Sequence, residues 1–277
     1  MFAQSTPIKS RNAIESASFF LLLNQPVDPA TTDRLKQALD QLKLELPGVA
    51  PQQLGFVINF VGGLAQPVAQ AGGGALTRFA SAIDGTHTWR VDANGNVIQV
   101  TCGEYTDFQE IWARAERYLR GLASVVSPDI GVVEVGLQIV DKFTYLPDLA
   151  EDSYQVDELF RADSPFLTGN ARDSGLLWHV YQGWFEGVGG AKMLHQVNIA
   201  NTNATEVDQR FASVIDHRMV VRWMTSPAPA LSELLGSDSE EVRSLAGLMR
   251  RMHRRNVEVM KKVLTDEKQR DIGLIRE

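Results

Sequence analysis

The chain has 277 residues, of which 44% are hydrophobic and 22% are charged. This balance is typical of a folded globular protein and excludes a chain that is disordered or of low complexity throughout. Lys and Arg number 27 against 34 Asp and Glu, and the net charge of -7 disfavours general binding to nucleic acid or to anionic membranes. The single cysteine, Cys102, excludes an internal disulfide and a multi-cysteine metal site. With neither a secretory leader nor a membrane-length apolar segment, we expect a cytoplasmic protein that does not associate with membranes.

Hydrophobic periodicity, turn residues and helix caps predict a mixture of strands and helices. The clearest element is a β-hairpin whose turn contains Asn94-Gly95, with Trp89 expected opposite Val100. Residues 147–170 are typical of a loop with a short helical turn near 156–160. The other expected elements, in chain order, are a strand over 13–23, a helix over 31–46, a strand over 54–61, the hairpin over 87–102, a helix over 107–124, a strand over 131–145, strands over 175–186, 192–202 and 210–224, and a helix from 238 or 239 to about 264.

These elements predict an α+β fold, in which antiparallel sheet packs against two mid-chain helices and a long C-terminal helix. The three strands after residue 170 are expected to form an antiparallel meander. A division near residue 105 would give an N-terminal α+β lobe with the hairpin over 12–104. The C-terminal α+β lobe, with the meander and the terminal helix, would then cover 105–277. One continuous domain is the alternative.

Several short segments carry a family resemblance. They are Tyr105-Thr106-Asp107-Phe108, the strand from Val135 to Phe143, Met252-His253 to Asn256, and Leu264 to Glu267, with a looser match at Ile14 to Ala17. Together they resemble a sporadically distributed bacterial family of similar length whose members have no assigned activity. In that family the long strand usually carries an arginine and an asparagine where this chain has Gln138 and Asp141. The resemblance implies an α+β fold with antiparallel sheet, transfers no catalytic residue, and associates the chain with mobile-element or defence-related systems.

The motifs of the common catalytic and cofactor sites are absent from the sequence. It has no dinucleotide fingerprint, no phosphate-loop ending and no Gly-x-Ser-x-Gly, and the five histidines lack metal-binding spacing. We therefore expect no catalytic residue, no metal and no cofactor. The leading hypothesis is a non-enzymatic binding or interaction protein with a protein partner.

Strand alternation places a set of aromatic and polar side chains on one face of the meander. Large rings among amides and charges suit a recognition surface, because they combine stacking area with directional hydrogen bonds. The alternative is that the long C-terminal helix covers the tryptophans and the charges form a solvated rim. The residues of this predicted binding surface are Trp178, Gln182, Trp184, Gln196, Asn198, Asp216, Arg218 and Arg222.

Two histidines offer an alternative enzyme site. If the last hairpin turns about residue 206, His195 lies opposite His217, and two imidazoles at that distance could relay a proton. Such an enzyme would be a hydrolase or a nucleic-acid-processing activity. Apolar neighbours such as Val197 and Ile215 favour instead a pair of core histidines bonded to each other or to the backbone.

The C-terminal helix is unusually basic for an acidic chain. Residues 243–262 carry seven Lys and Arg against one acidic residue, Glu258. The plain interpretation is that this helix contacts the acidic remainder of the same protein. The alternative is nucleic-acid binding through Arg250, Arg251, Arg254 and Arg255.

Overall fold

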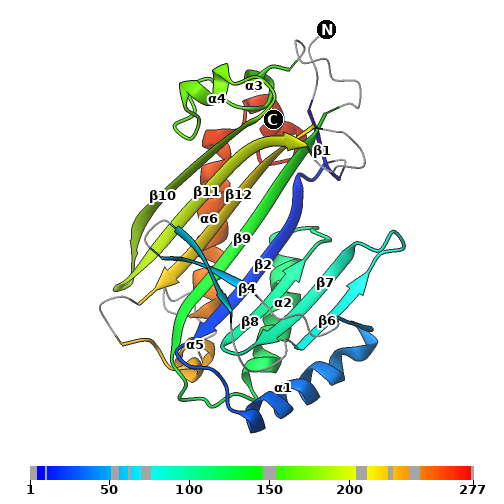
Figure 1. Ribbon diagram of the computed structural model, residues 1–277, viewed down its shortest axis with the longest axis vertical. Helices are drawn as coiled ribbons and strands as arrows, with labels where there is room; N and C mark the ends of the chain where they lie inside the picture. The colour runs from blue at the N-terminus through cyan, green and yellow to red at the C-terminus, as the bar shows by residue number, and fades with distance from the viewer. Residues whose placement is uncertain are drawn as a thin grey trace.

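The computed structural model describes residues 5–9, 11–50, 56–61, 64–69, 76–145, 154–203, 211–223, 227–236 and 244–275. Within them the chain has an α+β fold built on a ten-stranded antiparallel sheet of order β10-β11-β12-β9-β2-β8-β7-β6-β3, with β1 paired to β9 (Figure 1). A separate two-stranded sheet contains β4 (Phe56–Val61) and β5 (Leu64–Ala69). The strands of the large sheet are β1 (Thr6–Pro7), β2 (Ile14–Leu23), β3 (Gly48–Val49), β6 (Leu76–Ser81), β7 (His87–Asn94), β8 (Val97–Cys102), β9 (Val132–Thr144), β10 (Trp178–Val188), β11 (Ala191–Asn203) and β12 (Phe211–Arg222).

The two halves of the large sheet follow one pattern. Each half contributes one long strand, β2 or β9, to the centre of the whole sheet. A meander then follows in each half, and its last strand, β8 or β12, pairs with that long strand. A helix then follows the meander, α2 (Phe108–Ala123) in the first half and α6 (Leu245–Val263) in the second. Because β2 also pairs with β9, one sheet joins the two lobes predicted over 12–104 and 105–277. The division into domains stays a prediction.

Helices α2 and α6 cover one face of the sheet (Figure 1). The pairing of Phe19 with Leu137, and of Leu137 with Met219, aligns the odd-numbered residues of β2, β9 and β12 on that face. Phe19 is fully buried and its ring lies 5.3 Å from that of Trp112 in α2. The alternate side chains of these strands therefore pack against the apolar faces of the helices, and this contact forms the centre of the core.

The predicted helices are present with shifted ends. The first is α1 (Pro29–Gln41), capped by Asp28 and followed by a 3-10 turn, η1 (Leu42–Leu44). The second, α2, begins after its cap Asp107. The long C-terminal helix, α6, is described from Leu245 after the cap Ser244, and its predicted start at residue 238 or 239 lies outside the described residues. A short separate helix, α5 (Leu231–Gly236), precedes it. No helix in the part of the chain described above is long and apolar enough to cross a membrane.

The predicted β7–β8 hairpin is present, but its register differs by two residues. Trp89 pairs with Cys102, and the turn is the two-residue Gly95-Asn96, because Asn94 pairs with Val97. Gly95 has a φ of 58°, which the absence of a side chain permits. A shift of two leaves each side chain on its predicted face.

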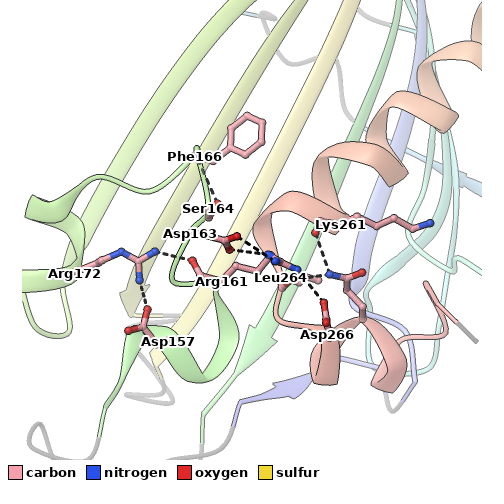
Figure 2. A network of polar contacts seen from close by, with 10 residues as sticks. Asp157, Arg161, Asp163, Ser164, Phe166, Arg172, Lys261, Leu264 and Asp266 are labelled. Atoms are coloured by element: carbon pink, nitrogen blue, oxygen red, sulfur yellow. Dashed lines mark hydrogen bonds and ion pairs between the residues drawn. The ribbon is translucent and has the colours of Figure 1, made fainter. Parts of the chain in front are cut away.

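Three short helices close one end of the molecule: α3 (Val156–Leu159), near the predicted helical turn, α4 (Gly169–Asp173) and α7 (Asp266–Asp271). Figure 2 shows the polar contacts that join them. Arg161 donates to Asp163 and to Asp266, both at 2.9 Å, and Arg172 donates to the carbonyl of Arg161 at 2.7 Å. The segment between β9 and β10 is thereby attached to the end of α6 and to α7.

Candidate functional site

The predicted recognition face is divided between the two sides of the sheet, so the prediction of one shared surface is wrong. Val188 pairs with Ala191 across the two-residue turn Gly189-Gly190, which has positive φ at both positions. Trp184 therefore pairs with His195 and lies on the helix-covered face. Trp178 and Gln182 share that face. The opposite face carries Gln196, Asn198, Asp216, Arg218 and Arg222.

The two tryptophans pack against Phe160, Phe166 and His195, and the cover by the long C-terminal helix that the alternative interpretation expects stays a prediction. Trp178 is buried and its indole N–H donates to the hydroxyl of Tyr154 at 3.0 Å. Trp184 stacks on His195 with 4.6 Å between ring centres and 3° between planes. The aromatic residues that β10 exposes are Tyr181 and Phe185, which are 52% and 57% exposed.

The polar residues of the opposite face bind one another. Gln138 donates to both carboxylate oxygens of Asp216, at 2.9 and 3.0 Å. The Arg218 guanidinium lies 4.9 Å from the ring centre of Phe20, and Arg222 pairs with Glu134 at 2.7 Å. Asp216 and Arg222 are thus paired within the sheet, whereas Oδ1 of Asn198 and Nε of Arg218 are buried without a hydrogen-bond partner among the described residues.

His195 and His217 are core residues joined by a hydrogen bond, as their apolar neighbours predict. His195 pairs with Met219, so the register again differs by two residues from the expected one and the histidines are diagonal neighbours. Nδ1 of His195 nevertheless lies 3.1 Å from Nε2 of His217, and the two side chains are 1% and 0% exposed. Burial lowers the pKa of both imidazoles, to about 3 for His217. At neutral pH both rings are uncharged.

The basic helix contacts the body of the protein through Glu186 of β10. Arg251 and Arg255 donate to this carboxylate at 2.5 and 2.9 Å. Burial opposes ionisation of Glu186, but the hydrogen bonds from both arginines lower its pKa to about 2. Of the four arginines predicted to bind nucleic acid, Arg254 is exposed and Arg250 is half-buried.

A cavity of about 540 Å³ lies on the helix side of the sheet, between the N-terminal segment and the C-terminal end of the chain. We call it the helix-side cavity. Its walls come from Lys9 and residues 11–14, from Tyr105 and Thr106 before α2, from Asp141 of β9, from four residues of α6, and from residues 272–274. The four residues of α6 are His253, Asn256, Val257 and Met260.

Asp141 is the unusual member of this wall. Its side chain is 3% exposed, and no described residue donates a hydrogen bond to its carboxyl group. Burial raises the pKa of Asp141 to about 7. A buried carboxyl group without a partner is costly, so the place of Asp141 in the cavity wall needs a physical explanation.

His253 faces the same cavity from α6. Its imidazole stacks on Phe108 with 3.9 Å between ring centres and 8° between planes, and it has no hydrogen-bond partner within the described ranges. Burial lowers the pKa of His253 to about 4, so the ring is neutral at pH 7. A neutral imidazole offers one donor and one acceptor to a ligand.

Asn256 connects the cavity to the two buried histidines. Its Oδ1 lies 3.0 Å from Nδ1 of His217, and the residue also lines the cavity. The sequence interpretation found the histidines but missed Asp141 and Asn256. One signal was available for Asp141: it is the only charged member of the inward-facing series Val135, Leu137, Ile139, Asp141, Phe143 on a long strand.

A second hollow, of about 760 Å³, lies beside the β10–β11 turn and α5. Its carboxylates, Asp129 and Glu233, are exposed to solvent, and neither is buried without a partner. Over the described ranges, no group of three or more His, Cys, Asp and Glu side chains is arranged to hold a metal ion. The helix-side cavity is therefore the stronger candidate.

The comparisons with known proteins identify no relative. No family model, no curated protein and no solved structure matches the chain. The functional argument consequently depends on the residues and geometry of the cavity.

Proposed function

We propose that this protein is a non-enzymatic binding protein whose ligand is a small molecule held in the helix-side cavity. The observation that carries the proposal is the buried carboxyl group of Asp141, which lines the cavity without a hydrogen-bond donor. A ligand that donates to this group would recover the free energy that its burial costs. The proposal keeps the class of function expected from the sequence and moves the site from the strand face to the cavity.

The size and lining of the cavity support a small ligand. A volume of about 540 Å³ falls within the range typical of small-molecule sites. The wall combines apolar side chains such as Ile14 and Val257 with the polar groups of Asp141, Asn256 and His253. Such a lining is typical of sites in which burial supplies affinity and a few polar groups supply orientation.

An enzyme centred on the histidine pair is a weaker proposal. His195 and His217 are both buried, and neither belongs to the wall of the cavity. A general base must reach the proton that it removes, directly or through one water. The pair touches the cavity only through Asn256, which does not titrate.

The interaction with a protein or a nucleic acid also stays a proposal. For a protein partner, the exposed rings of Tyr181 and Phe185 replace the predicted tryptophans as the aromatic contacts on β10. For nucleic acid, the pairing of Arg251 and Arg255 with Glu186 leaves Arg254 as the exposed arginine of the proposed set.

A fragment screen with a cavity-filling variant tests the proposed function. Single-ring ammonium, carboxylate and neutral fragments are added to the wild-type protein and to Val257→Trp, and thermal stability is measured. Fragments that bind the cavity raise the unfolding temperature of the wild type and not of the variant, because ligands stabilise only the state that binds them. Lys262→Gln, an exposed change on the same helix, should behave like the wild type. If no fragment distinguishes Val257→Trp from the wild type, the proposal is wrong.

A further inference from the structure

A chain of polar contacts runs from the surface of α6 to the helix-side cavity. Oε2 of Glu186 lies 3.4 Å from Nε2 of His195, and Nδ1 of His195 lies 3.1 Å from Nε2 of His217. Nδ1 of His217 in turn lies 3.0 Å from Oδ1 of Asn256. The first contact is an ion-pair distance at which Nε2 of His195 makes no hydrogen bond, so Glu186 acts there through its charge. Each of the other two contacts needs one donor and one acceptor, so the direction of one determines the direction of the other.

The charges at the surface end set that direction. Glu186 is ionised beside Arg251 and Arg255, so it can only accept. His195 therefore presents Nε2–H to Glu186, and as a neutral ring it has a bare Nδ1 that accepts from Nε2–H of His217. Nδ1 of His217 is then also bare. The carboxamide of Asn256 must then supply a donor, its amide nitrogen, which requires the amide to be turned by half a turn from the structure, where Oδ1 lies at this position.

This requirement determines what Asn256 offers to the cavity. The amide rotamer with Nδ2 towards His217 is related by a half turn to the one with Oδ1 there, and the hydrogen-bond network selects between the two. With Nδ2 engaged, the carbonyl oxygen is the end available to a ligand. Asp141 contributes a second acceptor from β9, and Val257 and Met260 supply apolar contact. Two acceptors beside an apolar wall suit a ligand with several N–H donors.

We propose that the helix-side cavity binds a small organic cation, an ammonium or amidinium group on an apolar body, through Asp141 and the carbonyl oxygen of Asn256. The Glu186–His195–His217 chain holds Asn256 in the orientation that favours such a cation. This inference rests on the proposed function and adds the chemical class of the ligand. His195, His217 and Glu186 are positioning residues in this arrangement, since none of them touches the ligand.

The first experiment compares three probes that share a phenyl ring: 2-phenylethylammonium, the neutral 2-phenylethanol and the anionic phenylacetate. Their affinities for the full chain are measured by calorimetry at about pH 8, where Asp141 is ionised. We expect the ammonium to bind roughly tenfold or more tightly than the alcohol, because hydrogen bonds between charged groups are the stronger ones. Phenylacetate should not bind measurably. Asp141→Asn should remove the preference for the cation.

The second experiment tests the chain behind Asn256. In Glu186→Gln the carboxamide can donate as well as accept, so the chain no longer imposes one direction. The preference for the ammonium should then fall by roughly tenfold, although the substituted residue lies on the far side of both histidines from the cavity. Glu258→Gln is the matched control, because Glu258 bonds to the same Arg255 and does not contact a histidine. Its preference should equal that of the wild type.

Nitrogen-15 NMR reads the tautomers directly. In the wild type, both His195 and His217 should carry their proton on Nε2, with an unprotonated Nδ1. A proton on Nδ1 of either ring, or an unchanged preference in Glu186→Gln, would overturn the role of the chain. If phenylethanol or phenylacetate binds as tightly as the ammonium, and this binding is lost in Val257→Trp, the ligand is not selected as a cation. The proposed binding function would still hold. No binding by any probe or fragment contradicts both proposals.

Discussion

Asp141 illustrates how one residue can oppose stability at a site that suits a ligand. Its neighbours across the sheet are Ile14 and Ile215, so the fold places a carboxyl group where an apolar side chain would pack. The ammonium of Lys9, which lines the same cavity, is held by the carbonyls of Ile14, Glu15 and Gly103. Lys9 is therefore already engaged, and no described residue donates a hydrogen bond to Asp141.

The stability that Asp141→Asn gains over the wild type should depend on pH. The pKa of Asp141 is about 7 in the folded protein against an ordinary value near 3.8, so folding favours the protonated acid. Wild-type stability is therefore lost as pH rises from about 4 through 7, and the variant, which cannot ionise, escapes this loss. We expect equal stability below about pH 4 and a gain of a few kcal/mol for the variant above pH 7.

Urea unfolding at a series of pH values measures this difference. Tyr105 and His253 face the same cavity, but they are present in both proteins and their titration cancels in the comparison. The exposed Asp33→Asn on α1 serves as the control and should show no pH-dependent gain. A stability difference that is the same at pH 4 and pH 8 would contradict the assignment of Asp141 as a buried, unpartnered acid.

At the scale of elements, α7 joins the two ends of the described chain. Lys268 of α7 is 4% exposed, and its ammonium lies 2.7 Å from Glu158 of α3 and donates to the carbonyl of Ser5 at 2.8 Å. Ser5 donates through its hydroxyl to the same Glu158 at 2.6 Å. Together with the Arg161 and Arg172 contacts of Figure 2, these bonds hold α3, α7 and the N-terminal segment as one unit next to the cavity.

Lys268→Met should therefore be strongly destabilising. The substitution removes the counter-charge of the Glu158 carboxylate, and the loss of one partner of a buried ion pair costs about 3–5 kcal/mol. The free energy of unfolding from urea denaturation provides the measurement. Lys262→Met, on the exposed side of α6, should have little effect. A second change, Glu158→Leu, should recover part of the loss, and a Lys268→Met protein as stable as the wild type would refute the structural role of the pair.

At the scale of the whole molecule, the pairing of β2 with β9 makes the halves of the sheet interdependent. Leu21 of β2 is fully buried and lies between Ile98 of β8 and Val135 of β9. The strand pairing is continuous from the first meander to the second, so we expect the two halves to unfold together. Unfolding of one half would expose the central strand of the other.

Leu21→Ala should lower the stability of both halves together. Loss of the buried side chain costs about 2–5 kcal/mol, and hydrogen exchange should report the same loss for peptides of α1 and of β11. The exposed Leu44→Ala, at 91% exposure, should leave exchange unchanged. Loss of protection confined to the first half would instead support two separate lobes.

Local patterns in the sequence predicted most of the elements correctly, because caps, turns and side-chain period act over a few residues. Asp28 and Asp107 begin helices, and the β7–β8 and β11–β12 hairpins keep the predicted faces despite registers that differ by two. The burial of the two histidines was also predicted, from their apolar neighbours. Each of these outcomes depends on residues close in the chain.

Neither the error in the predicted recognition surface nor the cavity could be derived from local patterns, because both depend on contacts between residues that are far apart in the chain. One two-residue turn, Gly189-Gly190, decides whether Trp184 lies beside Gln196 or beside His195, and an odd shift moves a whole strand to the other face. The cavity brings Lys9, Asp141 and Asn256 together from three distant parts of the chain. Only tertiary packing determines which buried polar groups have hydrogen-bond partners. The proposed ligand site depends on Asp141, whose buried carboxyl group has no donor among the described residues.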